Sequence, residues 1–237
     1  FIMGNSCTKA FRSSDWNHYV HGRPFRMFAN SEDLGGICMK LEALNSQPHQ
    51  PIKHLLLVME PSTFINADGK EDFMHIMPPE VSHKSRITYQ TTFLQGFFTP
   101  KFFMPYMTYI ITKKFSQKRN GIFNVTVPVH EKYTNDAVLP QDKMIAEMGN
   151  RYWQQDYWKK ALSKSYAWTI QPHSISSLQI SELKEIKCLC QQQHCNLKII
   201  ISPEFSKKMM SPQDITILYA IFGPHIVYDF SNKHYLW

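Results

Sequence analysis

Several features that would assign a sequence to a class at once are missing from this chain of 237 residues. It has no internal repeat and no low-complexity tract, and with 43% hydrophobic residues it is not globally disordered. Its five cysteines are an odd number, which argues against a disulfide framework. The length suits one large α/β domain, or a domain that carries an inserted lobe.

The chain also lacks a long block of basic residues. Lys and Arg number 26 against 19 Asp and Glu, and the net charge of +7 favours an acidic partner such as an anionic glycan or a phospholipid surface. The basic residues are scattered and no nucleic-acid recognition motif accompanies them, so we do not predict binding to nucleic acid.

A second cysteine pair is absent as well. Cys188, Cys190 and Cys195, with His194 between them, have a spacing that suggests a metal cluster. Zinc sites usually combine a Cys-x2-4-Cys pair with a second, distant pair. The end of a buried helix is therefore favoured over a metal site.

No initiator methionine, charged leader or signal peptide stands at the start of the chain. Phe1 already lies within a predicted strand. We therefore expect a piece of a longer protein, with any export signal or membrane anchor upstream.

What the sequence does contain is an alternation of short apolar runs and helical patterns near both ends. This is typical of a parallel sheet built from crossover units. The continuous apolar run at 52–59 predicts a central strand covered on both faces. The predicted strands are 1–3, 25–29, 52–59, 196–202 and 225–230, and the predicted helices are 13–19, one that begins at 31–33, 176–193 and 212–222.

The alternation stops between residues 61 and 175, which hold most of the aromatic side chains. We predict a helical, aromatic-rich insertion over the strand ends, within a single domain that spans 1–237. Residues 93–111 are apolar enough to suggest a membrane span, but polar residues and prolines interrupt them. A core or lid helix is favoured over a surface that dips into lipid or holds an acyl chain. The interrupting residues are Gln95, Pro100, Lys101 and Pro105.

The feature that bears most on function is Ser6, where the first predicted strand gives way to a helical segment. Ligands of open α/β sheets bind outside the carboxyl ends of the strands. Backbone N–H groups at a helix start, here those of Ser6 and Cys7, suit a developing oxyanion. The alternative is that Ser6 only caps the first helix. The candidate pocket residues are Cys7, Asn30, Ser31, Glu32, Glu60 and Ser62.

Three groups of residues resemble the SGNH/GDSL-type hydrolases, most closely an uncharacterised, envelope-associated bacterial branch related in style to proteins of D-alanyl transfer and alginate acetylation. The resemblance covers 1–60 and 176–231. It implies a three-layer α/β/α sandwich with a short parallel sheet, SGNH- or flavodoxin-like, and Ser6 as the nucleophile. The residues that carry it are Gly4-Asn5-Ser6, Asn30-Ser31-Glu32, and the late stretches 199–205 (IIISPEF), 211–223 (SPQDITILYAIFG) and 227–231 (VYDFS).

The chain departs from the family pattern in the oxyanion hole. The family has a glycine in its second block, where this chain has Asn30-Ser31, and an asparagine in its third, where this chain has Glu60-Pro61-Ser62. Glu60 is either a polar substitute near the site or a solvated carboxylate at a strand end.

The catalytic base is a second departure. The family carries Asp-x-x-His on a loop after the last strand, which would begin near Trp237. Two Asp-x-x-His strings, at 15–18 and 72–75, lie elsewhere and are interpreted as coincidences, and Asp229 and His234 have the wrong spacing. Either the catalytic loop follows Trp237 or the protein has no hydrolytic triad.

The resemblance implies a serine esterase or O-acyltransferase that acts on an envelope glycan or a lipid-linked sugar and needs no metal or organic cofactor. It would work in the cell envelope, in the periplasm or close to the membrane. The alternative is a catalytically inactive relative, an envelope binding or scaffolding module whose aromatic insertion contacts sugar or a partner protein.

Overall fold

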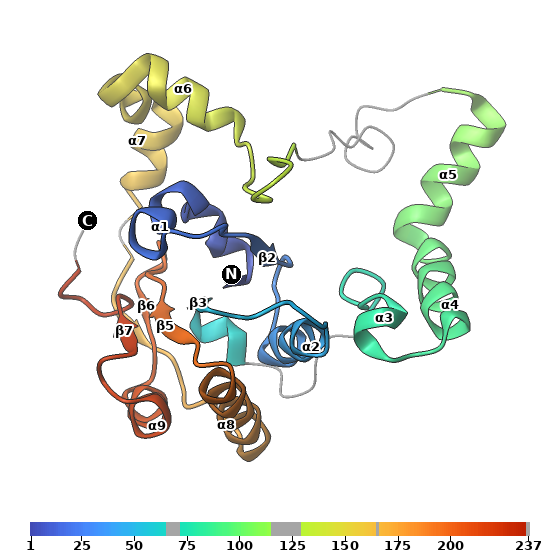
Figure 1. Ribbon diagram of the computed structural model, residues 1–237. Coiled ribbons are helices and arrows are strands. Elements are labelled where there is room, and N and C mark those ends of the chain that lie inside the picture. The colour runs from blue at the N-terminus through green and yellow to red at the C-terminus, as the bar shows by residue number, and fades with distance from the viewer. Residues whose placement is uncertain (65–71, 115–128, 165, 236–237) are drawn as a thin grey trace.

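The computed structural model describes residues 1–64, 72–114, 129–164 and 166–235. Its centre is a five-stranded sheet with the order β2-β1-β3-β5-β7 (Figure 1). All neighbouring strands are parallel, as predicted. The order is that of an open doubly wound sheet, which reverses its direction of growth between β1 and β3. The strands are β1 (Ile2–Gly4), β2 (Arg26–Phe28), β3 (His54–Met59), β5 (Asn196–Ile201) and β7 (Val227–Asp229).

Helices cover both faces of this sheet and complete a three-layer α/β/α sandwich. Helices α2 (Leu34–Asn45), α8 (Ser177–Gln192) and α9 (Pro212–Phe222) bury one face. The other face is covered by the 3-10 helix η1 (Ser6–Ala10) and by α1 (Ser13–Val20). The large core on the first face includes Met3, Leu55, Leu57, Met59, Ile199 and Ile201 of the strands, and the smaller one centres on Ile2, Leu56 and Val58.

Local signals explain where these helices begin and end. Asp33 caps α2 by accepting a hydrogen bond from Gly36 N at 3.0 Å. Ser176 and Gln179 form a capping box at the start of α8. Helix α9 has Pro212 in its first turn and ends before Gly223, whose φ is 93°. The predicted helices at these places are confirmed.

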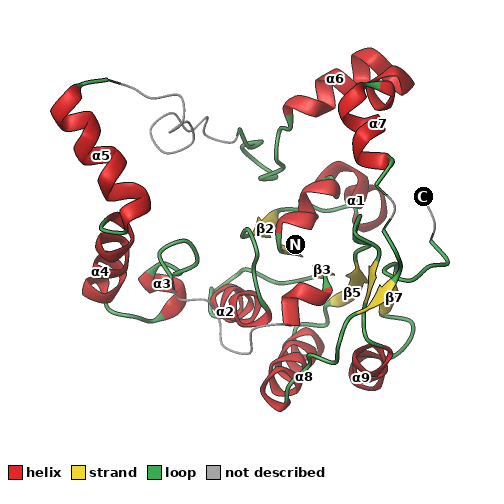
Figure 2. Ribbon diagram, turned by 180° about the vertical axis from the view of Figure 1, so that it is seen from behind, coloured by secondary structure: helices red, strands yellow, loops and turns green. Residues whose placement is uncertain are grey.

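The segment between β3 and α8 is largely helical, as predicted, and its helices lie in two groups (Figures 1 and 2). One group, α3 to α5, projects from the side of α2, and the other, α6 to α7, lies beyond α1. Aromatic rings gather in each group, as predicted. Before α8 the chain also forms β4 (Thr169–Ile170), which pairs with β6 (Lys208–Met209) in a two-stranded parallel sheet that the sequence did not predict. The helices are η2 (Pro61–Phe64), α3 (Pro79–Ser82), α4 (Arg86–Phe97), α5 (Pro100–Thr112), α6 (Pro140–Met148), η4 (Gly149–Gln154) and α7 (Asp156–Leu162).

Residues 130–137 attach the insertion to the outer edge of β2. Arg26 N donates to Thr134 O at 2.9 Å, and Asn135 Nδ2 donates to Arg26 O at 2.8 Å. The Arg26 guanidinium, 1% exposed, pairs with Asp136 at 3.2 Å. Burial lowers the pKa of Arg26 and the Asp136 carboxylate opposes that change. An ion pair between the buried Arg26 guanidinium and the partly exposed Asp136 carboxylate therefore joins the sheet to the insertion.

No helix in the described part of the chain combines the length and the hydropathy of a transmembrane segment. The apolar stretch at 93–111 is divided between two helices, and the second of these, α5, has 13 residues.

Candidate functional site

The tight approach of β1 to β3 sets the geometry around Ser6. Gly4, the last residue of β1, has a φ of 143°, and a Cβ atom there would lie 2.0 Å from Val58 O. Only glycine fits this contact without a shift of the backbone. The chain then turns through Asn5 into η1, which leaves Ser6 exposed at the carboxyl edge of the sheet.

Asn5 connects the ends of β1 and β3, where the sheet reverses its direction of growth. Its side chain is 2% exposed and its Nδ2 donates to Glu60 Oε2 at 2.8 Å. Ser62 Oγ donates to the same oxygen at 3.1 Å. Glu60 is thus a half-buried acceptor of two hydrogen bonds and not simply a solvated strand-end carboxylate.

The cap of η1 is Asn5, so the interpretation of Ser6 as a helix cap is wrong. Asn5 Oδ1 accepts from Cys7 N at 2.9 Å and lies 2.7 Å from Cys7 Sγ. The Cys7 amide, a predicted oxyanion donor, is therefore engaged by Asn5, and its use for an oxyanion requires that side chain to move. That role stays a prediction.

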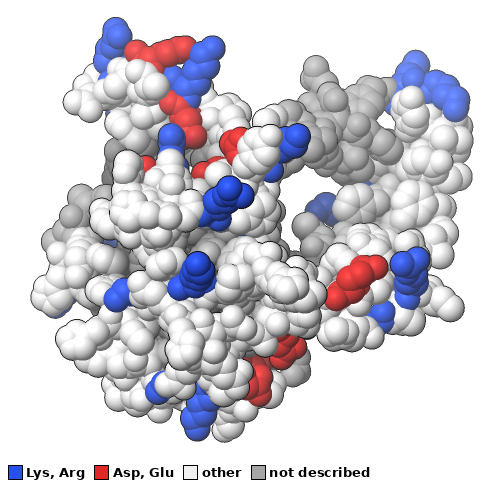
Figure 3. Space-filling model, in the orientation of Figure 1, with Lys and Arg blue, Asp and Glu red and all other residues white. Residues whose placement is uncertain are grey.

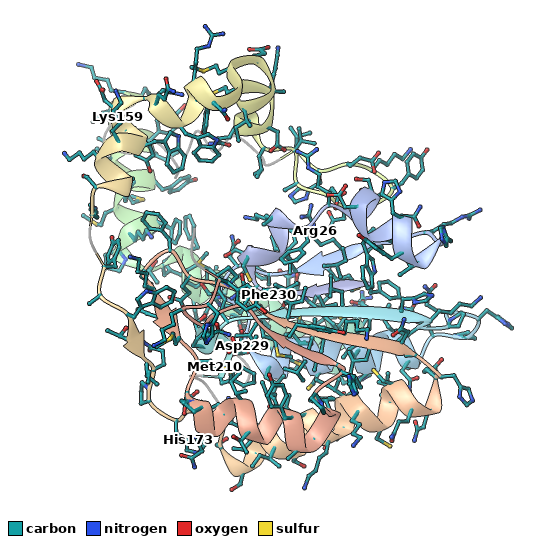
Figure 4. All side chains as sticks on the ribbon, turned by 90° about the vertical axis from the view of Figure 1, so that its left-hand side faces the viewer. Arg26, Lys159, His173, Met210, Asp229 and Phe230 are labelled. Carbon is teal, nitrogen blue, oxygen red and sulfur yellow. The ribbon has the colours of Figure 1, made fainter. Side chains whose placement is uncertain are left out.

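A cavity of about 780 Å³ opens beside Ser6 at the carboxyl ends of β1, β5 and β7. Its walls are mostly apolar. Phe230, which follows β7, packs against Tyr235 with ring centroids 4.7 Å apart, and Figure 4 shows Phe230 close to the sheet. The lining residues are Ser6, Cys7, Ala10, Phe11, Ile200, Ser202, Pro203, Phe230 and Tyr235.

The Cys7 thiol shares this wall but is a poor nucleophile. Burial raises its pKa, and the nearby Glu60 carboxylate raises it further. The thiolate is the reactive form of cysteine, and at neutral pH this thiol stays protonated. Ser6 is the better candidate of the two neighbours.

Asn30, Ser31 and Glu32 do not line the cavity beside Ser6. Glu32 is 4% exposed and pairs with Lys40 at 2.5 Å. Burial raises the pKa of Glu32 and Lys40 counteracts this. Asn30 Oδ1 accepts from Lys9 Nζ at 3.2 Å, and Ser31 has a left-handed φ of 53°. These residues build the turn between β2 and α2, and a role in an oxyanion hole stays a prediction for them.

Two aspartate–histidine pairs occur in the described ranges. The string at 72–75 does form a contact, with His75 Nδ1 2.9 Å from Asp72 Oδ2. His75 Nε2 lies 2.9 Å from Asn30 O. Because both ring nitrogens face oxygen acceptors, this ring is not poised to take a proton from Ser6.

The second pair, His173 and Asp214, was not predicted. His173 Nδ1 is hydrogen-bonded to Asp214 Oδ1, and Asp214 Oδ2 accepts from Ser174 N at 3.0 Å. Asp214 is 1% exposed in the first turn of α9, and Figure 4 shows His173 beside that helix end. Within the described residues, no histidine lines the Ser6 cavity. Nor do the described residues contain a group of three His, Cys, Asp or Glu that could hold a metal ion.

Sequence reasoning missed several residues of this site. Asn5 was treated only as part of a motif, and the cavity walls after β5 and β7 were not predicted. The signal was present, because the carboxyl ends of parallel strands share one edge. The missed wall residues are Ala10, Phe11, Ile200, Ser202, Pro203, Phe230 and Tyr235.

Comparison with known proteins finds no matching family model, no matching curated protein and no matching solved structure. The α/β fold with its five-stranded parallel sheet is what the structure establishes.

Proposed function

We propose that the protein is an SGNH/GDSL-like serine esterase or O-acyltransferase with Ser6 as its nucleophile. The observation that supports this proposal is an exposed serine on the wall of a large, mostly apolar cavity at the carboxyl edge of a parallel sheet. The acidic or sugar part of the substrate would face solvent, and the acyl part would enter the cavity. An acylated envelope glycan or a lipid-linked sugar has this chemistry.

In the proposed reaction, Ser6 Oγ attacks the ester carbonyl and the alcohol leaves with a proton. Water or an acceptor hydroxyl then takes the acyl group from Ser6 and returns the proton to the serine. Phe11, Ile200 and Phe230 would surround the acyl chain. The backbone N–H of Ser6 is the first oxyanion donor in this scheme.

The reaction also needs a base. The family resemblance puts the base histidine on the loop after the last strand. Phe230 and Tyr235, which precede the expected start of that loop near Trp237, both line the cavity. We propose that a histidine in this loop takes the proton of Ser6, since His75 and His173 are engaged elsewhere.

A fluorophosphonate probe on the native, full-length protein tests the nucleophile. We expect labelling that is lost in Ser6→Ala and kept in the control Ser62→Ala, an exposed serine off the cavity wall. Because Asn5 provides the cap, Ser6→Ala should change the free energy of unfolding by less than about 0.5 kcal/mol. Folded protein without labelling, or labelling that persists in Ser6→Ala, contradicts the proposal.

Two observations favour a second function, that of a catalytically inactive envelope binding or scaffolding module. Among the described residues no histidine lines the cavity, and the Cys7 amide is engaged by Asn5. An assay with an octanoyl ester of a monosaccharide distinguishes the esterase from the binding module. Release of octanoate that depends on Ser6 supports the enzyme, whereas saturable binding of the intact ester by both wild type and Ser6→Ala supports the binding module.

A further inference from the structure

The helices α4 and α5, residues 86–112, follow one another end to end as a helical arm that exposes an unusual amount of apolar surface (Figures 1 and 2). Among its residues only Gly96 is buried. Rings at the turn contact one another, as in the pair Phe97 and Tyr106 with centroids 5.2 Å apart. Along the outer part of α5, Met104 and Ile111 are 59% and 75% exposed. Exposed apolar patches of this kind mark interaction surfaces.

The net positive charge of the chain comes from the same region of the sequence. Residues 81–130 contain seven Lys and Arg and no Asp or Glu, so the rest of the chain carries 19 of each sign and is neutral. On the α4–α5 arm and at its described end, the cations are Arg86, Lys101, Lys113 and Lys114. Arg86 is paired with Glu80 at 3.7 Å, which leaves the three lysines as the cations that define the surface.

The α4–α5 arm stands clear of the sheet. Both ribbon views show α4 and α5 on an arm that projects beyond α2 (Figures 1 and 2). In the space-filling view this arm is mostly uncharged, with Lys and Arg at its upper end and a mixed patch of both signs at its lower end (Figure 3). The described residues of the arm thus present an apolar surface with cations at its upper end.

We propose that the α4–α5 arm binds the surface of an anionic lipid bilayer, with the helices parallel to the membrane plane. At 1.5 Å per residue α5 spans about 20 Å, less than the hydrocarbon core of a bilayer. Interfacial helices combine Lys and Arg with bulky apolar and aromatic residues, as this arm does. Apolar residues cover most of the α5 circumference, which suits partial immersion in acyl chains better than a narrow seam against one protein helix.

The charge pattern also argues against a second copy of the chain as the occupant. Two copies that met through this surface would bring Lys101, Lys113 and Lys114 against the same lysines, and residues 86–114 contain no carboxylate to pair with them. Like charges placed together in this way oppose association. An anionic bilayer supplies the missing opposite charge. The proposal does not depend on the role of Ser6.

Flotation of the full chain with vesicles tests the proposal. The vesicles are phosphatidylcholine alone, or phosphatidylcholine with about 30% phosphatidylglycerol. We expect binding to the anionic vesicles, weakened by salt because exposed charges are screened. The variant K101Q/K113Q/K114Q should bind them about 100-fold more weakly, since each lysine near a charged surface is worth about fivefold.

The matched control is K159Q/K160Q/K164Q, which removes the same charge from exposed lysines on and after α7. It should bind as the wild type does. The variant M104Q/M107Q/I111Q keeps every charge and should lose at least about tenfold in binding, because the apolar insertion is removed. Circular dichroism confirms that each variant is folded.

Three results would overturn the proposal. One is folded wild-type protein that does not float with anionic vesicles. Another is an equal loss of binding in the variant of the arm lysines and in the control lysine variant. The third is a dimer in analytical ultracentrifugation that M104Q/M107Q/I111Q dissociates, because a second copy would then cover this face.

Discussion

Helices α2 and α5 are almost equal in length and both are rich in apolar residues, yet they have opposite environments. Nine of the twelve residues of α2 are buried, between the sheet and α8. None of the thirteen residues of α5 is buried. The difference shows that apolar composition predicts a helix but not what its apolar side meets, since burial needs a partner that lies elsewhere in the chain or outside it.

The largest expected effect comes from the closest packing in the sheet region. Gly4→Ala forces a Cβ atom against Val58 O and a left-handed φ on alanine, and it should lower the free energy of unfolding by about 4 kcal/mol. Gly149, in the insertion, is the matched control. It has a φ of 55° and nothing within 4 Å of an added Cβ, so Gly149→Ala should cost only about 1 kcal/mol. Urea denaturation measures both, and equal losses would refute this view of Gly4.

A pair of leucines sharpens the same contrast. Leu57 is fully buried in β3, and Leu57→Ala should cost about 3 kcal/mol because it leaves a cavity in the core. Leu94 in α4 is 55% exposed, and Leu94→Ala should change stability by less than about 0.5 kcal/mol in the absence of lipid. Thermal or urea unfolding measures the loss of stability in each of the two variants. A large loss for Leu94→Ala would mean that α4 is packed against a partner in solution.

Two arginines that reach the insertion give the smallest expected difference. Arg26→Met leaves Asp136 and several carbonyls without their buried donor and should cost about 2 kcal/mol, less than a fully buried pair because Asp136 is 21% exposed. Arg12 and Asp142 form an exposed pair at 3.3 Å, and Arg12→Met should cost less than about 1 kcal/mol. If denaturation gave the two variants the same stability, Arg26 would not be the anchor of the insertion.

The sheet region was largely predictable because each of its signals acts locally. Ser211-Pro212 starts α9 and Gly223 ends it, as expected from capping and from the backbone freedom of glycine. The apolar run at 52–59 predicted β3, whose buried side chains face both layers. These choices depend on neighbours in sequence, so one sequence suffices to read them.

The candidate site was only partly predictable because it depends on distant residues. Ser6 was identified from its place after the first strand, and the structure brings it to a cavity edge. The bond from Asn5 to Glu60, 55 residues apart, requires the strand order before it can be foreseen. The ion pair between Glu32 and Lys40 was likewise not foreseen, and the predicted role of Glu32 in the pocket stays a prediction.

The loop at 130–137 also has a consequence for solubility. An outer strand of a sheet normally offers its backbone groups to other molecules, which invites edge-to-edge aggregation. Here the N–H and C=O of Arg26 at the β2 margin are already satisfied by Thr134 and Asn135. The insertion therefore covers this edge of β2. A chain without residues 130–137 would leave these backbone groups of Arg26 open to pairing with a strand of another molecule.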